Sequence, residues 1–381
     1  TALLLTAALC VSASASQYDS VAQDLSAIGM FRGTGNGFDL DRAPTRSEAA
    51  IMLVRLYGAE DKAKAAYDAG EITHPFTDVS AYTSPYVAWL YTNGITNGTS
   101  ATTFGSGRAC TLQNYVVFLL RALGYKDGTD FQYAQATNLA QTCGFYTPLL
   151  FDGTFLRDDL AALTYQALAA NVKGTDTSLL ASLIASGAID KTAAKPLTDK
   201  IDAYRALVTS TSGTESHSMD LDTVSVTDMT IKADGKTTSS KMTTSSSTQS
   251  IINGSDIRMA VTSKTTADGT AVESSSWIKD GWLYTATAAE DGTAKIKLSV
   301  GDDFAELEDL VQLPDLNVSG LATVKSISSR KSGADTVYTL VVDKNTLNGL
   351  MDSIMTGMLG SFGSMDDVKF STQFSDMTIH Y

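Results

Sequence analysis

The chain has 381 residues, 43% of them hydrophobic, so it is long and apolar enough to bury at least two separate cores. Its 42 acidic residues outnumber its 28 basic residues, and the net charge of −14 argues against a nucleic-acid partner, because phosphates would be repelled. The three histidines and three cysteines show no metal-ligand spacing, so we predict no metal site and no cofactor.

The start of the chain has the pattern of a secretion signal. An apolar run leads to the sequence ASA at 13–15, which suits signal peptidase, so residues 1–15 are predicted to be a signal peptide. Neither a methionine nor a basic segment precedes Thr1, and we expect the signal to be truncated. No later apolar run reaches the roughly 18 residues of a membrane span. Export would permit a disulfide between Cys110 and Cys143, but both positions suit a small buried thiol, which we favour.

Three segments repeat one pattern: a short amphipathic helix that ends at a glycine, a loop, and a second amphipathic helix. The glycines are Gly29, Gly94 and Gly144, and the interval to the second helix is shorter in the third copy. Apolar residues recur three and four positions apart on each second helix, which marks one buried face. A single helix pair cannot bury such a face alone, so the three copies are predicted to form one helical bundle.

The composition changes after the repeats. Another helix is expected over 178–190, and Pro196 indicates a connector leading into a further helix, so 196–212 is predicted as a linker with a helix. The Ser/Thr-rich segment 237–250 suits either a disordered stalk or a strand, and we favour the strand because it lacks proline.

Residues 213–381 are predicted to form an α+β domain with an antiparallel meander sheet. Its first strands are separated by the Asp-Gly pairs at 268–269, 280–281 and 291–292, which favour tight hairpins. The elements expected next are a helix at 302–311, strands near 320–330 and 335–342, a helix capped by Asn345, and strands at 368–374 and 377–381. The last strand has no turn or tail after it, so we expect the C-terminus to be cut as well.

The three repeats resemble S-layer homology modules, the triplet that anchors exported proteins to bacterial cell walls. The resemblance is carried by FDLDRAPTRSEAAIML (38–53), FTDV (76–79), YVAWLYTNGITNG (86–98) and the weaker FLRDDLAALTYQAL (155–168). It predicts modules at 16–70, 71–126 and 127–195. The family resemblance implies a pseudo-threefold helical bundle whose grooves bind an anionic, often pyruvylated, secondary cell-wall polysaccharide.

The residues that the resemblance assigns to polysaccharide binding are spread over the copies. They are Arg46 and Glu48 of the TRAE-like motif, Asp78 of the FxDV motif, Trp89 of the first helix, the loop glycines Gly94 and Gly98, and Arg157 of the third copy. The second copy has TLQN at 111–114 and lacks the arginine, while the third has LRDD at 156–159 and lacks the threonine. One or two competent grooves are therefore expected.

The start of the second helix in the first copy raises a separate question about Arg46. Thr45 and Glu48 predict a capping box, but a cation at a helix N-terminus is opposed by the helix dipole. An anionic sugar substituent that docks at the free amides of this helix end, with its carboxylate held in a bidentate pair by the Arg46 guanidinium, would explain the arginine. The alternative is a surface ion pair with Asp39 or Asp41, and the family resemblance favours the ligand contact.

Two other assigned residues have equally plain structural explanations. The Trp89 ring suits a sugar face, but large aromatic residues also dominate bundle cores. Asp78 suits either a sugar hydroxyl or a cap for a helix that starts near Ser80. The pair Asp39 and Asp41 resembles a calcium loop only loosely and is interpreted as a polar turn.

The C-terminal half weakly resembles the half-barrel of LolA-type lipoprotein carriers. Such a curved sheet would offer an apolar ligand site on Trp277, Trp282, Leu283 and the Met-rich helix 347–358. We favour the simpler interpretation that these residues form the ordinary core of the domain.

We therefore predict a non-enzymatic protein, with no catalytic residues, on the cell surface of a bacterium, most simply a Gram-positive one. Its partners are the secondary cell-wall polysaccharide and peptidoglycan, and self-assembly into a lattice is compatible with the resemblance. Two alternatives stay open: a wall-tethered carrier of a lipid or another hydrophobic ligand, and a surface enzyme whose catalytic site lies in the C-terminal domain.

Overall fold

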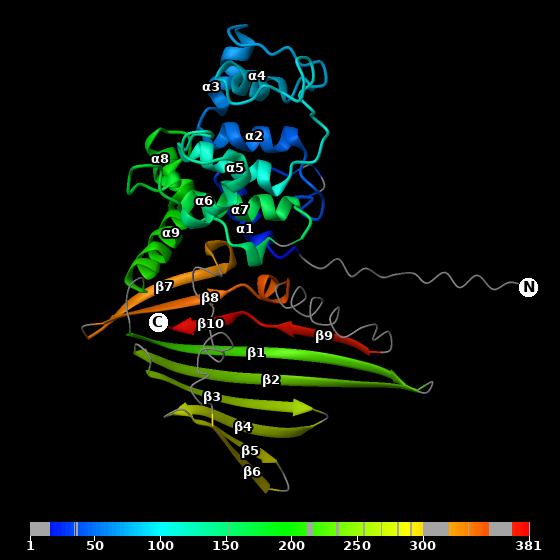
Figure 1. Ribbon diagram of the computed structural model, residues 1–381, viewed down its shortest axis with the longest axis vertical. Helices are drawn as coiled ribbons and strands as arrows, with labels where there is room; N and C mark the ends of the chain where they lie inside the picture. Colours follow the sequence, from blue (N-terminus) through cyan, green and yellow to red (C-terminus); the bar gives the residue numbers. More distant parts are fainter. Residues whose placement is uncertain are drawn as a thin grey trace, which may run out of the picture.

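The computed structural model describes residues 16–33, 35, 37–151, 153–211, 216–233, 236–253, 256–267, 269–279, 282–289, 292–299, 320–333, 335–349 and 368–380. A helical bundle forms one end of the molecule and an antiparallel sheet forms the other (Figure 1). The predicted signal peptide, the predicted helix at 302–311 and all but the first residues of the predicted Met-rich helix lie outside the described residues.

The bundle contains the helix pairs that the repeats predict. Its helices are α1 (Asp19–Ala27), α2 (Arg46–Leu56), α3 (Glu60–Asp68), α4 (Ser84–Thr92), α5 (Leu112–Ala122), α6 (Ala136–Thr142), α7 (Arg157–Ala169), α8 (Leu179–Ala185) and α9 (Lys191–Thr211), with short 3-10 turns η1 (Tyr133–Gln135) and η2 (Pro148–Leu150). Gly29, Gly94 and Gly144 follow α1, α4 and α6 with positive φ angles, which end a helix without a Cβ penalty. Of the described helices, none combines the length and apolar character needed to cross a bilayer.

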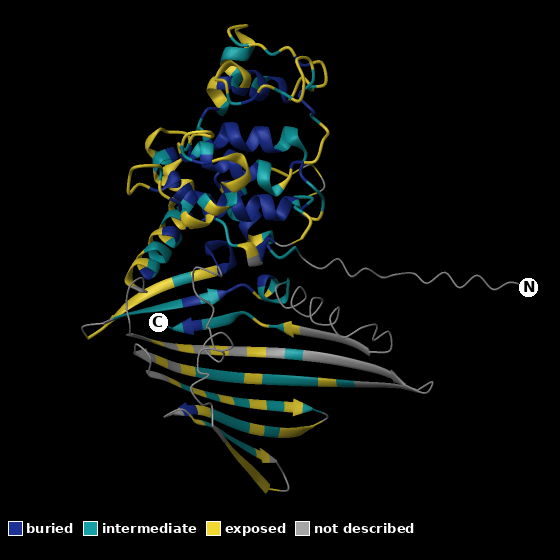
Figure 2. Ribbon diagram, in the orientation of Figure 1, coloured by how far each residue is buried: buried dark blue, intermediate teal, exposed yellow. Residues whose placement is uncertain are grey.

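The helices of the three pairs pack in a cyclic order. Helix α4 contacts α2, α6 contacts α5, and α1 contacts α7, while the second helices also meet as α2 with α5 and α5 with α7. The second helices are therefore mostly buried, as the dark ribbons of Figure 2 show. The largest fully buried side chains of the bundle include Tyr18, Tyr86, Tyr115, Tyr165, Phe31, Phe104 and Phe145.

Helix α9 connects the bundle to the sheet. It is continuous from Lys191 to Thr211 and contains Pro196, so the predicted boundary at residue 196 falls inside a helix. Proline removes one backbone hydrogen bond there, which a long packed helix tolerates. The side chain of Leu197 belongs to the bundle core and that of Leu207 to the core under the sheet.

The sheet confirms the predicted meander. Its strands are β1 (Ser216–Ala233), β2 (Lys236–Asn253), β3 (Asp256–Ala267), β4 (Thr270–Lys279), β5 (Trp282–Ala289), β6 (Gly292–Ser299), β7 (Val324–Ser332), β8 (Asp335–Val342), β9 (Val368–Phe374) and β10 (Met377–His380), and the turn η3 (Leu321–Thr323) precedes β7. The strand order is β6-β5-β4-β3-β2-β1-β10-β8-β7, and β9 pairs with β1. Strand β2 contains the Ser/Thr-rich segment, which is therefore a strand and not a stalk.

The register corrects two details of the prediction. Ala289 pairs with Gly292, so residues 290 and 291 separate β5 from β6 and the predicted turn at 291–292 is one residue late. Residues 344–349 are helical, but the amide of Asn345 donates to Oδ1 of Asp343 at 2.8 Å. Asp343, and not Asn345, is therefore the cap of that helix.

The two faces of the sheet have different surroundings. Leu207 of α9 packs against Leu340 and Ile379 on one face. The register between the paired strands, together with the alternation of side chains along each strand, places Trp277 and Trp282 on the other face of the sheet. There they are 39% and 37% exposed. The prediction that these tryptophans belong to the ordinary core is therefore wrong, because alternation along the strands turns them outward.

Candidate functional site

The N-terminus of α2 is joined to the loop that precedes α5. The amide of Arg46 donates to the carbonyl oxygen of Arg108 at 2.8 Å, and the amide of Ser47 donates to that of Ser106 at 3.3 Å. The amide of Glu48 donates to the Thr45 hydroxyl at 3.2 Å. The expectation of free amides at this helix end is therefore wrong, because the loop of the second copy already satisfies them.

Glu48 forms the predicted capping box and also links two helices. Its carboxylate accepts the amide of Thr45 at 2.7 Å, and it binds Arg42 at 2.6 Å and Arg157 of α7 at 2.7 Å. Burial acts to raise the pKa of Glu48, but the bonds from Arg42 and Thr45 and the charge of Arg157 outweigh it and lower the pKa. Both carboxylate oxygens of Glu48 are thus engaged within the protein.

Arg157, assigned to the third copy's groove, is a buried link between α7 and the first loop. Its side chain is 4% exposed and binds Glu48. Its Nε donates to the carbonyl oxygen of Phe38 at 3.0 Å, and its guanidinium lies over the Phe31 ring at 4.9 Å. The structure therefore places Arg157 where it holds the bundle together, and burial lowers its pKa.

The Arg46 side chain has a different environment. Its guanidinium carbon lies 4.9 Å from the centre of the Phe104 ring, and Nη2 donates to the Thr96 hydroxyl over a long 3.4 Å. Its Nε is buried and has no hydrogen-bond partner among the residues that the structure describes. Within the described part of the chain no ion pair includes Arg46, and Asp39 lies 3.7 Å from Arg42 instead. The ion-pair alternative therefore does not account for Arg46.

Positive charge gathers around Arg46. Burial lowers the pKa of Arg46, and the nearby charges of Arg108 and Arg121 lower it further. Arg108 is exposed, while Arg121 donates to the carbonyl oxygen of Ile95 at 3.1 Å and forms a long ion pair with Asp127 at 3.6 Å. In a chain of net charge −14, this group of arginines is a local site that favours an anion.

Cys110 lies beside this group but does not neutralise it. Cys110 is buried and Cys143 is half-buried, and both are free thiols. Burial raises the pKa of the Cys110 thiol to about 12, although the charge of Arg46 opposes the rise. The thiol is therefore neutral at physiological pH, and the charge of Arg46 stays uncompensated.

The two assigned glycines differ in what surrounds them. Gly94 has φ +69° and open space where a Cβ would lie. Gly98 has φ +73°, and a Cβ there would enter the Phe76 ring and approach the Thr103 carbonyl oxygen to 2.6 Å. The Gly98 amide donates to the Thr96 hydroxyl at 3.3 Å, so this loop positions the hydroxyl that Arg46 contacts.

Asp78 shapes the loop that carries Phe104. Its carboxylate accepts the amides of Phe104 and Gly105 at 2.7 Å and of Ser106 at 3.0 Å. Burial acts to raise the pKa of Asp78, but these amides outweigh it and the pKa is lowered. Helix α4 begins at Ser84, so the alternative that Asp78 caps a helix near residue 80 is wrong.

Trp89 packs α4 against the end of α2. The ring is half-buried, and its centre lies 5.4 Å from that of Tyr57. The charge of Arg121 acts on both Tyr57 and Arg46, so Trp89 lies at the interface between the first and second copies (the joint). Asp78, Gly98 and Arg46 meet at this joint, whereas Glu48 and Arg157 meet on the side of Arg42.

The sequence did not single out four residues of this site. They are Thr96, Phe104, Arg108 and Arg121. Thr96 lies inside the NGITNG motif and so had a signal, while the other three approach Arg46 only through packing between copies. We name Arg46, Thr96, Phe104, Arg108 and Arg121 the Arg46 cluster. Among the described residues no group of His, Cys, Asp and Glu is placed to hold a metal ion.

A comparison with protein families identifies part of this site. Residues 75–111 match the model of the S-layer homology domain, so the chain contains such a domain. The match includes Asp78, Trp89, Gly94 and Gly98 and ends before α5, and Arg46 lies outside it. Domains of this family anchor proteins by binding cell-wall polymers, which indicates a protein associated with the cell wall at the cell surface. No curated protein matches the chain.

Proposed function

We propose that this chain anchors an exported protein non-covalently to the bacterial cell wall, by binding an anionic secondary polysaccharide at the Arg46 cluster. The observation that carries the proposal is the Arg46 guanidinium, which is half-buried on Phe104 without a carboxylate partner among the described residues. A ligand carboxylate, such as that of a pyruvyl ketal, would accept two hydrogen bonds from this guanidinium and form the bidentate ion pair that it lacks within the described residues.

We also propose that the three helix pairs form an S-layer homology triplet with one competent groove. The cyclic contacts of α4 with α2, α6 with α5 and α1 with α7 support three equivalent units. The second copy has Leu112 where the first has Arg46. In the third copy, Arg157 already forms an ion pair with Glu48. The joint between the first and second copies therefore supports binding best.

The proposal assigns the chain no catalytic role. Asp78 and Glu48, the two carboxylates that the resemblance assigns to binding, accept bonds on both oxygens and have lowered pKa values, so neither is poised as a general acid at neutral pH. The C-terminal sheet would then be the domain that the anchor displays at the wall.

Sedimentation with purified wall sacculi tests the proposal. We expect the full chain to co-sediment, Arg46→Gln to bind about tenfold more weakly because a charged hydrogen-bonded contact is lost, and Arg46→Lys to fall between them. Arg330→Gln, at an exposed position on β7, is the matched control and should bind like the parent chain. Unchanged binding of Arg46→Gln, or full retention on sacculi stripped of the secondary polymer, would refute the proposed ligand.

A further inference from the structure

The second helices of the first two copies carry an arginine at the same position. Nine residues after Arg46, Arg55 donates to the carbonyl oxygen of Met30 at 2.9 Å, just after the loop glycine of its own copy. At the same position of the second copy, Arg121 donates to the carbonyl oxygen of Ile95 at 3.1 Å. These bonds tie the second helix of each copy to its glycine loop.

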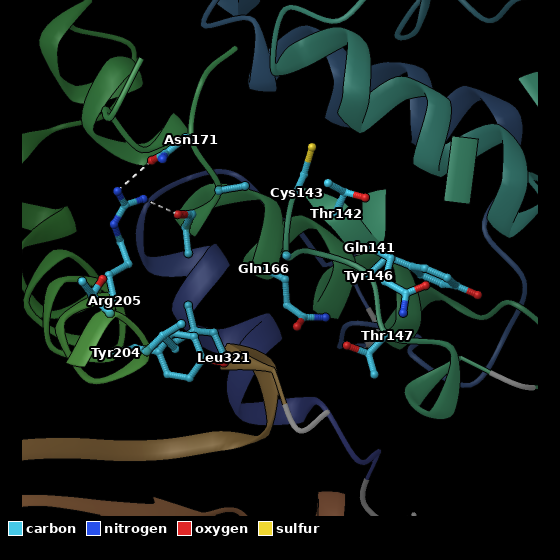
Figure 3. A pocket seen from close by; sticks show the side chains of 15 residues that line it. Gln141, Thr142, Cys143, Tyr146, Thr147, Gln166, Asn171, Tyr204, Arg205 and Leu321 are labelled. Carbon is cyan, nitrogen blue, oxygen red and sulfur yellow. Dashed lines mark hydrogen bonds between the residues drawn. The ribbon is translucent and has the colours of Figure 1, made fainter. Parts of the chain in front are cut away.

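The third copy has Gln166 at this position, and the corresponding bond is missing. Gln166 is 3% exposed, and its Nε2 is buried without a hydrogen-bond partner among the described residues. A buried amide donor without an acceptor costs free energy, and a bound molecule that supplied an acceptor at this position would remove that cost. Figure 3 shows the Gln166 side chain projecting into a cavity between Tyr204 and Leu321 on one side and Tyr146 and Thr147 on the other.

The cavity lies where the third copy meets α9 and the turn η3. It has a volume of about 630 Å³, within the range of roughly 300–1,000 Å³ typical of small-molecule sites. Its walls carry the hydroxyl groups of Thr142, Tyr146 and Thr147, beside the ring of Tyr204. The lining thus combines hydroxyl groups with aromatic surface, as sugar ligands require.

Arg205 of α9 adds a positively charged side chain to the wall of the cavity. Within the described part of the chain, the acceptors of Arg205 are neutral oxygens: the carbonyl of Ala169 at 2.6 Å, the side chain of Asn171 at 2.7 Å and the carbonyl of Asp176 at 3.0 Å. No ion pair of the described residues includes Arg205. Its charge is therefore fixed in place by neutral groups and is not matched by a carboxylate, which favours an anionic ligand.

We infer that this cavity is a second binding site, for a sugar that carries a carboxylate. The carboxylate would be held by the charge of Arg205, the buried amide of Gln166 would donate to an acceptor on the sugar, and the hydroxyl groups of the wall would bind the rest. The site is separate from the Arg46 cluster, because it uses the end of α7 and a helix beyond the repeats.

Saturation-transfer difference NMR on the full chain tests the inference. Galacturonate and a polygalacturonate fragment serve as anionic probes, and galactose, which lacks the carboxylate, is the control ligand. We expect at least one anionic probe to bind; the monomer would identify a free sugar as the source, and the fragment alone would identify a residue of a polysaccharide. Binding of neither, or binding of galactose equal to that of galacturonate, would overturn the inference.

Variants locate the site. Gln166→Leu and Arg205→Gln should each weaken probe binding about tenfold, whereas Arg330→Gln should leave it unchanged. Gln166→Leu should keep or raise the Tm, since it removes a buried polar group that has no partner among the described residues. Intact binding by a folded Gln166→Leu variant would overturn the assignment. Wall anchoring is measured separately, by sedimentation with sacculi, so failure of this site and failure of the wall anchor are distinguishable.

Discussion

The Arg46 guanidinium lies over the Phe104 ring at 4.9 Å, although the two residues belong to different repeats. The loop that carries Phe104 also accepts the amides of Arg46 and Ser47 at the start of α2, so the same loop orients the cation and closes the helix end. The joint between repeats is therefore preorganised, and little ordering would be needed when an anion binds.

Arg157→Ala should be strongly destabilising. The variant removes a buried guanidinium together with its bonds to Glu48 and to the carbonyl oxygen of Phe38, and we expect a loss of about 3 kcal/mol in the free energy of unfolding. Arg42→Ala is the matched control, because Arg42 binds the same oxygen but its side chain is 40% exposed, and about 1 kcal/mol or less should be lost. Urea titration measures both, and equal losses would contradict the structural role of Arg157.

Glu60 predicts acid sensitivity in the bundle. Burial raises its pKa, but hydrogen bonds from Arg55, Lys64 and Tyr86 outweigh this and lower the pKa from 4.5 to about 2. The pKa is lower in the folded chain, so the stabilisation is complete above about pH 4.5 and is lost as the pH falls towards 2. Unfolding at pH 7 and pH 3 should show Glu60→Gln losing less stability than the parent over this interval, by up to about 2 kcal/mol.

Local patterns predicted the elements, and contacts between distant residues decided the site. The Thr45 and Glu48 capping box and the strand at 237–250 followed from short-range sequence. That Arg157 would be buried on Glu48 could not be foreseen, because the two residues are 109 positions apart and only packing brings them together. The amides of α2 are covered by a loop for the same reason.

The two loop glycines should respond differently to alanine. Gly94→Ala meets open space, so it should cost only the strain of a positive φ, about 1 kcal/mol. Gly98→Ala has the same strain and also collides with Phe76 and Thr103, and about 2 to 4 kcal/mol should be lost. Thermal unfolding of the pair tests this, and equal Tm values would mean that the loop relaxes away from Phe76.

Asp78→Asn should weaken wall binding indirectly, although Asp78 itself does not contact the proposed ligand. The aspartate accepts three amides of the loop 104–106, and an asparagine turns donors towards some of them, so we expect about 1 to 3 kcal/mol of lost stability. The loop would then hold Phe104 less firmly under Arg46 and loosen the cation. Sedimentation with sacculi should show weaker binding for Asp78→Asn than for the parent.

Asp61→Asn, an exposed change in the first turn of α3, is the control and should bind like the parent. A direct sugar contact by Asp78 would give a different result, because Asp78→Asn would then lose binding while its Tm stayed at the parent value. Joint loss of Tm and binding supports the indirect role, since both oxygens of Asp78 already accept loop amides.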